Sequence, residues 1–387
     1  MLPLFDEFDK LLTEDQRELR DLARRFTEKE IVPHIDRWEA EKHFPREALQ
    51  GLAALGLLGV PTPAPWGGAG LGYLEYALVL EELSVGSSAL AVTVAVTGLP
   101  QVILVKFGDD AQKERYLRDL AAGKTLGAFC LTEPGSGSDA AALKTTAVRD
   151  GEHYVINGTK RFITNGGEAD VYVVMARTGP EKSRGISAFI VTKGTPGLSF
   201  GKPEHKMGWD SSRTVEVYFD NVRVPAADRV GPEGIGFKVA MTALDSGRVT
   251  ISASSLGLAR AAIEHAVRYA AERKQFDQAI VEFQGIQWMF ADMVAKLSVA
   301  RSASRDAARL KDMGASITLA ASIAKLAATD AAMAVTTDAL QILGGNGYMR
   351  EYPLERLMRE AKVMQIVEGT NQIQRMVIAR ELIKAAG

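Results

Sequence analysis

Cysteine is nearly absent from the chain, and histidine is scarce. Cys130 is the only thiol among 387 residues, which excludes an intrachain disulfide and a thiolate metal cluster. A single thiol suits a reducing compartment, and we expect Cys130 to be a small buried hydrophobic side chain. The five histidines form neither an H-E-x-x-H motif nor an i, i+4 pair, so we expect no metal site built on them.

A surplus of charge of either sign is also missing. The 46 Lys and Arg residues against 48 Asp and Glu residues give a net charge of −2, so no basic surplus suggests nucleic acid or anionic lipid as a partner. No G-x-x-x-x-G-K-[ST] loop occurs either, which removes the simplest phosphotransfer interpretation.

Export and membrane signals are lacking as well. The chain starts with acidic residues where a signal peptide would be basic. The most apolar segment, 89–105, is interrupted by Thr, Gly, Pro and Gln, and Lys325 and Asp330 interrupt the Ala-rich segment 317–335. We expect buried helices, no membrane span, and a location in the bacterial cytosol or, in a eukaryote, in the mitochondrial matrix as a mature chain.

Hydrophobic periodicity divides the chain into three parts, which we place at residues 1–125, 126–232 and 233–387. Helical spacing marks the first part, which begins with a capping box at Thr13 and Gln16. The second part holds short runs rich in Val, Ile, Phe and Tyr, separated by DG, NG and GG turn dipeptides. Helical spacing returns at about 234–273, 283–312 and 314–343 and in a shorter pair beyond Glu355.

A glycine-rich loop, "LTEPGSGSDA" at 131–140, matches the G-x-G-x-x-A spacing of a dinucleotide-binding turn. That turn needs a crossover helix and a parallel strand after it, but a hairpin pattern, "TTAVRDGEHYVING", follows here. We therefore reject a Rossmann fold. Two interpretations stay open: an ordinary surface turn, or a strand-end loop whose glycines and amides approach a ligand closely.

Three C-terminal patterns admit a structural or a functional interpretation. Glu368, after an apolar run in "AKVMQIVEGTNQIQRMVIAR", is either part of a helix cap or a carboxylate whose apolar neighbours raise its pKa for proton abstraction. "QILGGNGY" at 341–348 is either a helix C-cap or backbone pressed against a ligand. Arg273 in "ERKQF" is either a cation at a helix end or a partner for phosphate.

Seven motifs, taken in order, give nearly the whole chain a resemblance to one family. They are "LTEPGSGSD", "KRFITNGGEAD", "DNVRVP", "LDSGR", "ERKQFDQ", "QILGGNGY" and "IVEGTNQIQR". Together they resemble the FAD-dependent acyl-CoA dehydrogenases, and within them the short-chain (butyryl-CoA) type. The resemblance implies an α+β fold with an N-terminal helical domain, a central antiparallel β-barrel or sandwich and a C-terminal four-helix bundle. It also implies a homotetramer, a dimer of dimers.

The resemblance implies a chemistry too. An acyl-CoA thioester would lie between the flavin and Glu368, which would remove a Cα proton while flavin N5 takes a hydride from Cβ, leaving trans-2-enoyl-CoA. The electrons would pass to an electron-transfer flavoprotein. Hydrogen bonds from the Glu368 N–H and a flavin hydroxyl would stabilise charge on the thioester carbonyl. The implied substrate contacts are Ser138, Asp245, Arg248 and Gly369.

By the same resemblance, the residues that bind FAD lie in several stretches. The strand-end loop and the segment "RFIT" would line the flavin, and residues of the C-terminal part would hold the rest, several of them across a subunit interface. The implied FAD contacts are Phe129, Leu131, Thr132, Gly137, Ser138, Phe162, Ile163, Thr164, Arg273, Phe276, Gln284, Gln341, Gly344, Gly345, Thr370 and Gln372.

Three positions bear on the branch of the family. Val367 stands where the family usually has Tyr, and Phe162 where many members have Trp, so both could reshape the pocket near the thioester. In the isovaleryl branch the base comes from the "LDSGR" region, where this chain has Gly247, which disfavours that branch. The alternative functions are a flavin-dependent oxidase or monooxygenase on the same fold, a non-catalytic helical scaffold, and a nicotinamide dehydrogenase.

Overall fold

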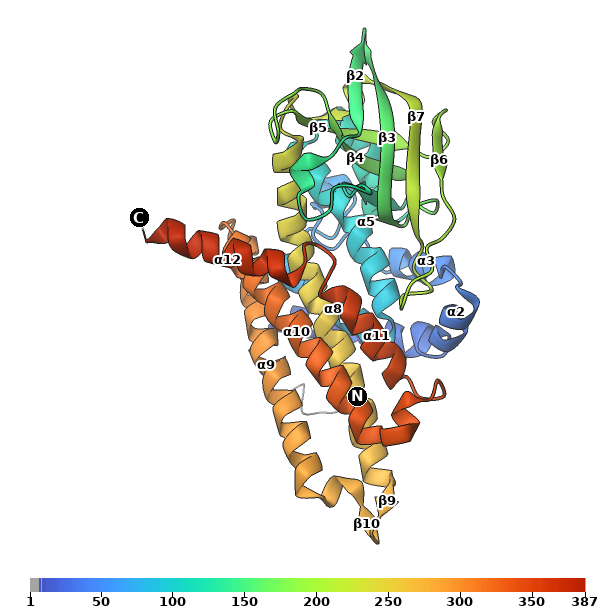
Figure 1. Ribbon diagram of the computed structural model, residues 1–387, viewed down its shortest axis with the longest axis vertical. Helices are drawn as coiled ribbons and strands as arrows, with labels where there is room; N and C mark the ends of the chain where they lie inside the picture. Colours follow the sequence, from blue (N-terminus) through green and yellow to red (C-terminus); the bar gives the residue numbers. More distant parts are fainter. Residues whose placement is uncertain (1–6, 8, 387) are drawn as a thin grey trace.

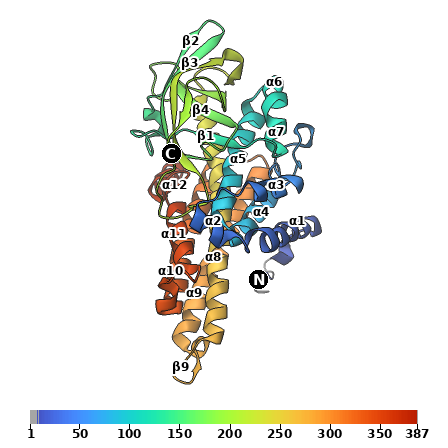
Figure 2. The same cartoon turned by 90° about the vertical axis from the view of Figure 1, so that its right-hand side faces the viewer.

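Helical, β and helical parts follow one another along the chain, as the periodicity predicts. The computed structural model describes Glu7 and residues 9–386. The β-sheet forms one end of the elongated molecule, and the long C-terminal helices reach the opposite end. The N-terminal helices pack beside the middle of the molecule (Figures 1 and 2).

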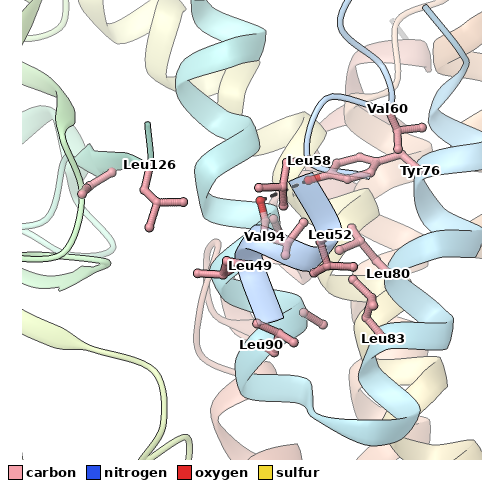
Figure 3. Packing of buried hydrophobic residues seen from close by; sticks show 14 of the residues in the cluster. Leu49, Leu52, Leu58, Val60, Tyr76, Leu80, Leu83, Leu90, Val94 and Leu126 are labelled. Carbon is pink, nitrogen blue, oxygen red and sulfur yellow. Dashed lines mark hydrogen bonds between the residues drawn. The ribbon is translucent and has the colours of Figure 1, made fainter. Parts of the chain in front are cut away.

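The N-terminal part is built from helices that bury their apolar faces on one another. The predicted capping box starts α1, where Thr13 Oγ1 accepts a hydrogen bond from Gln16 N at 3.3 Å. Leucines and valines of α3, α4 and α5 form the core, in which Tyr76 donates its hydroxyl to the Val94 carbonyl at 3.2 Å (Figure 3). The helices are α1 (Glu14–Phe26), α2 (Ile35–Glu41), α3 (Arg46–Ala54), α4 (Tyr73–Gly86), α5 (Ser88–Phe107), α6 (Asp110–Gln112) and α7 (Arg118–Ala121).

The middle part is one mostly antiparallel sheet. Its order is β6-β7-β3-β2-β4-β5-β8, with β1 added beside β4. The strands are β1 (Gly127–Cys130), β2 (Thr146–Asp150), β3 (His153–Thr164), β4 (Val171–Arg177), β5 (Ile186–Thr192), β6 (Leu198–Phe200), β7 (Thr214–Pro225) and β8 (Arg229–Val230). Cys130 is buried in it, as predicted. A G-x-S-x-G spacing at 197–201 places Ser199 in edge strand β6 and not at a strand-to-helix turn, so it forms no nucleophile elbow.

One predicted turn is wrong. Asn157–Gly158 lies inside β3, where the pairing with β7 shifts register between Ile156 and Gly158. The dipeptide makes a bulge and not a hairpin, because Gly158 has a φ of 150° and a Cβ there would stand 2.7 Å from the Thr145 Cα. The predicted hairpin at Asp150–Gly151 is confirmed, since β2 and β3 pair there antiparallel.

The rejection of a Rossmann fold is also confirmed. β1 and β4 do pair in parallel, but the chain between them runs through the glycine loop and the β2–β3 hairpin and contains no crossover helix.

Long helices make the C-terminal part. α8 (Gly236–Glu272), α9 (Gln284–Asp312), α10 (Thr318–Leu343) and α11 (Leu354–Met364) pack together, and α12 (Asn371–Ala385) projects from them (Figure 1). A two-stranded hairpin, β9 (Lys274–Gln275) and β10 (Gln278–Ala279), joins α8 to α9. On α8, Arg260 bonds Glu82 of α4 at 2.6 Å and Glu81 at 3.1 Å, and this buried network joins the helical parts.

Two helical segments, Ser88–Phe107 and Thr318–Tyr348, are long and apolar enough to cross a membrane by length and composition. In the first, 83% of the most apolar stretch of the helix is buried inside the protein, so the predicted buried helix at 89–105 is confirmed. In the second, half is buried, and its polar residues bond to neighbouring helices as described below.

Candidate active site

Glu368 lies in a tight turn between α11 and α12. Thr370 caps α12 by accepting a hydrogen bond from Ile373 N at 3.3 Å. Glu368 and Gly369 have left-handed backbone, with φ of 56° and 90°. Non-glycine residues rarely adopt this region, and such strain gathers at functional sites. The capping interpretation therefore holds for Thr370, whereas Glu368 is the strained residue of the turn.

Side chains from three helices hold this turn. Arg248 of α8 donates Nε to the Glu368 carbonyl at 3.4 Å. Gln374 of α12 donates Nε2 to the same carbonyl at 3.3 Å and to the Gly369 carbonyl at 2.8 Å. Lys325 of α10 donates its ammonium to the Gly369 carbonyl at 3.0 Å. Because each contact is to a backbone carbonyl, the turn is fixed whatever side chain stands at position 368.

The Glu368 carboxylate faces α8 at a position that has no side chain. A Cβ added to Gly247 would stand 2.4 Å from Oε2 and 2.9 Å from Oε1 of Glu368. Oε2 is buried and has no hydrogen-bond partner among the residues that the structure describes, although the residue as a whole keeps some exposure. A buried carboxylate oxygen without a partner calls for an explanation, and a substrate bound there supplies one.

Burial raises the pKa of Glu368 to about 7, although Arg248 and Lys325 both act to lower it. Burial disfavours the charged form because the carboxylate loses its hydration. A carboxyl group that titrates near neutral pH is suited to proton transfer at that pH. The geometry and the electrostatics of the turn are those that a general base requires.

The residues predicted to bind FAD fall into two separated groups. The first lies around β1, β3 and the turn: Phe129, Leu131, Thr132, Gly137, Ser138, Phe162, Ile163, Thr164, Thr370 and Gln372. The second lies at the far end of the long helices: Arg273, Phe276, Gln284, Gln341, Gly344 and Gly345 (Figure 1). The buried cluster that contains Leu131 includes Ala243 of α8, one turn before Gly247, and Gly247 faces Glu368. Arg273 lies about 38 Å from Arg248 along α8, at 1.5 Å per residue.

The glycine loop after β1 is anchored at its start and open at its tip. The buried carboxylate of Glu133 accepts hydrogen bonds from the amides of residues 144–145 at 2.6 and 2.9 Å and from Lys160 Nζ at 2.8 Å. Lys160 also donates to the Leu131 carbonyl at 3.0 Å. Apart from its two chain neighbours, no described residue has a heavy atom within 4 Å of a Cβ built on Gly137. The loop is therefore a fixed surface that a ligand can approach closely.

Phe162 is exposed by an irregularity in β3. The register with β7 shifts between Lys160 and Ile163, and Phe162 has a φ of 57°. Its ring is 57% exposed, whereas Ile163 is 2% exposed and offers a ligand only its backbone. Bulges often re-aim a side chain next to an active site. The Arg161 amide donates to the Thr132 carbonyl at 2.8 Å, so this exposed apolar ring comes one residue after a bond to the loop. The ring and the loop together fit the aromatic, hydrogen-bonding ring of a flavin.

Asp245 and Arg248, implied as CoA contacts, bond mainly to the protein itself. Asp245 accepts hydrogen bonds from Arg248 Nη1 at 2.7 Å and from Thr318 Oγ1 at 2.8 Å. Arg248 is only 5% exposed, and burial lowers its pKa although Asp245 and Glu368 favour its charged form. These contacts place Arg248 beside the turn of Glu368, and a CoA contact for either residue stays a prediction.

Sequence reasoning assigned neither Gln374 nor Lys325 to the site. Lys325 served only as an argument against a membrane span. A signal existed on α10: polar residues recur at helical spacing in an Ala-rich helix, at Thr318, Ser322, Lys325 and Thr329. Polar groups on one face of an otherwise apolar helix need buried partners, so that face marks a polar site.

Comparisons with known proteins match nearly the whole length of the chain. Family models of acyl-CoA dehydrogenases match residues 13–124 (N-terminal domain), 128–222 (middle domain) and 234–383 (C-terminal domain). An acyl-CoA dehydrogenase of Bacillus subtilis (strain 168) is 46% identical over 374 residues, which are 96% of this chain and 99% of that protein.

Two solved structures are similar over the same length. The butyryl-CoA dehydrogenase of Megasphaera elsdenii has a TM-score of 0.95 at 42% identity, covering 96% of this chain and 99% of that one. A chain from a structure described as the electron transferring flavoprotein of Acidaminococcus fermentans, in work on flavin-based electron bifurcation, has a TM-score of 0.95 at 45% identity, covering 96% and 98%. With its three matched parts and the carboxylate turn, this chain belongs to the acyl-CoA dehydrogenase family, whose members are flavoprotein oxidoreductases that act on CH–CH groups.

Proposed function

We propose that the protein is an FAD-dependent acyl-CoA dehydrogenase that converts a fatty acyl-CoA to its trans-2-enoyl-CoA, with Glu368 as the base. One observation carries this proposal: Oε2 of Glu368 is buried against Gly247, where no side chain stands, and has no hydrogen-bond partner among the described residues. A general base must lie within hydrogen-bond reach of the proton that it takes. The substrate Cα would have to lie within this reach of the Glu368 carboxylate.

The residues of the turn have separate tasks in this reaction. Glu368 would accept the Cα proton, and its backbone N–H would bind the thioester carbonyl as charge develops there. Arg248, Gln374 and Lys325 would hold the turn, so that little reorganisation precedes proton transfer. When bound, the flavin of FAD supplies the acceptor for the Cβ hydride. The acyl chain would exclude water from the carboxylate.

The two groups of predicted FAD contacts support an assembly of several copies. A single chain holds them at opposite ends of α8, so if both bind one FAD, the second group comes from another copy. We therefore propose a homotetramer in which the far ends of the long helices complete the neighbour's cofactor site. The similarity to a chain from an electron-transferring-flavoprotein structure supports an electron-transfer flavoprotein as the electron acceptor.

The kcat/KM is expected to rise with pH through about 7, because only the carboxylate form of Glu368 can accept a proton and its pKa in the free protein is raised to about 7. Below that pH kcat/KM should fall about tenfold per pH unit, as for a single required base. The measurement is kcat/KM for acyl-CoA-dependent reduction of an electron acceptor, with circular dichroism as a check on folding. A flat profile across this range in the folded enzyme would contradict the assignment of Glu368.

Replacing Arg273 by Ala is expected to lower FAD occupancy, because this exposed cation of the second group is proposed to bind a neighbour's cofactor. The loss should appear as a lower ratio of flavin to protein absorbance after dialysis. Lys274→Ala is the matched control, since it removes the same charge one residue further along the exposed hairpin. Equal occupancy in the two variants would remove Arg273 from the site.

A further inference from the structure

A polar stripe runs along one face of α10 toward the active-site turn. Ser322, Lys325 and Thr329 are all 0% exposed in a helix that is otherwise rich in alanine. Ser322 Oγ accepts a hydrogen bond from Arg248 Nη1 at 3.4 Å. Thr329 Oγ1 accepts one from the side-chain amide of Asn371 at 2.9 Å. The stripe therefore bonds both to α8 and to the first residue of α12.

Lys325 lies at the centre of this stripe, under the turn. Its ammonium donates to the Gly369 carbonyl at 3.0 Å and to Asn371 Oδ1 at 2.8 Å. Asn371 in turn donates to Asp330 Oδ1 at 2.6 Å. A fully buried ammonium is expensive unless it is well bonded and faces negative charge. The chain keeps this cation at a position where a well-packed apolar side chain would often give equal or higher stability.

We propose that Lys325 is a positioning residue for the base: its ammonium fixes the left-handed Glu368–Gly369 turn and supplies positive charge that favours the ionised form of Glu368. The inference rests on the proposed role of Glu368 and extends it to the residue beneath. Lys325 bonds to the backbone of the turn and not to the carboxylate, so it acts through Glu368.

The charges around Lys325 support this role. Glu368 faces it from the turn, Arg248 from α8, and Asp330 from the next turn of α10. Asp330 is itself paired with Arg375 of α12 at 3.0 Å. Burial acts to lower the pKa of Lys325, and the carboxylates of Glu368 and Asp330 oppose this by favouring the charged ammonium. Lys325 and Arg248 are also the two cations that lower the pKa of Glu368.

Three variants test the proposal in the flavin-loaded enzyme. Lys325→Met removes the ammonium and keeps the length of the side chain, whereas Lys325→Arg keeps the charge. The control is Thr336→Val on the same helix, because the buried Thr336 hydroxyl donates to two carbonyls of its own helix, Ala332 at 2.8 Å and Met333 at 3.2 Å.

Lys325→Met should lower kcat about 10–100-fold with KM changed by less than about threefold, because a small displacement of a positioned base costs rate without weakening substrate binding. The low-pH limb of its kcat profile should move to higher pH, since one of two cations near Glu368 is gone. Amides of the turn should exchange hydrogen faster by mass spectrometry. Lys325→Arg should restore most of kcat and the pH limb.

Two results would overturn the proposal. In the first, Lys325→Met has the same low-pH limb of kcat and the same amide hydrogen exchange in the turn as the unmodified enzyme. In the second, Thr336→Val shows the same changes as Lys325→Met. If Lys325→Met does not fold, Lys325→Gln replaces it with the same expectations. Failure of the proposed function is distinguishable, because Glu368→Gln would then retain turnover, whereas amide exchange in Lys325→Met reports on the turn independently of catalysis.

Discussion

Replacing Glu368 by Gln is expected to lower turnover about 10²–10⁴-fold, the usual contribution of a general base. Gln has the same shape but cannot accept a proton at neutral pH. The fold and the FAD content should be retained, because Arg248, Gln374 and Lys325 bond to the backbone carbonyls of the turn and not to the side chain. Loss of rate with retained flavin separates a chemical role of Glu368 from a structural one.

The measurement for Glu368→Gln is kcat with its preferred acyl-CoA, together with flavin content and thermal unfolding. Glu351→Gln is a suitable control, because Glu351 is exposed and lies before α11, outside the turn. Turnover of Glu368→Gln within about threefold of the unmodified enzyme would remove Glu368 from the base role.

Replacing Gly247 by Ala is expected to lower turnover about 10–100-fold while leaving stability equal or slightly higher. The new Cβ would stand 2.4 Å from Oε2 and 2.6 Å from Cδ of Glu368, so the carboxylate must move away from the position that it now occupies. Displacement of a reacting group by about 1 Å is enough for a loss of this size. Ala in the interior of a helix is favoured over Gly by up to about 1 kcal/mol, which offsets the cost of that movement.

Ser302→Ala is the control, since Ser302 is exposed in the middle of helix α9 and its hydroxyl donates to the Ser298 carbonyl of the same helix at 3.2 Å. It should leave kcat unchanged. The test compares kcat and thermal unfolding of both variants. Undiminished kcat in Gly247→Ala would show that the carboxylate does not need the space beside α8.

Periodicity predicted the elements well where they are long and failed where local chemistry has two outcomes. The helical spacing that starts at 234, 283 and 314 marks α8, α9 and α10 to within a few residues. The turn predicted at Asn157–Gly158 was wrong because a dipeptide that closes a hairpin also suits a bulge. The pairing with β7 decides between the two. The domain limits at 125/126 and 232/233 stay predictions.

The site was predictable in its parts but not in its arrangement. The motif around Glu368 marked the candidate base, but no local pattern shows that Gly247, about 120 residues earlier, leaves the space for its carboxylate. The same holds for Lys325 of α10, whose partner, the Gly369 carbonyl, lies in the connection between α11 and α12. Arg273 is separated from the first group of predicted FAD contacts because α8 is long, and the order of motifs in the sequence does not show this distance.

The most direct test of the proposed function is an anaerobic titration of the purified flavoprotein with acyl-CoAs of increasing chain length and with branched short-chain thioesters, following the visible absorbance of the flavin. We predict that at least one acyl-CoA bleaches the flavin, that a short or branched chain does so best, and that Glu368→Gln suppresses the bleaching. A flavin-loaded protein that no acyl-CoA reduces would contradict the proposed substrate class.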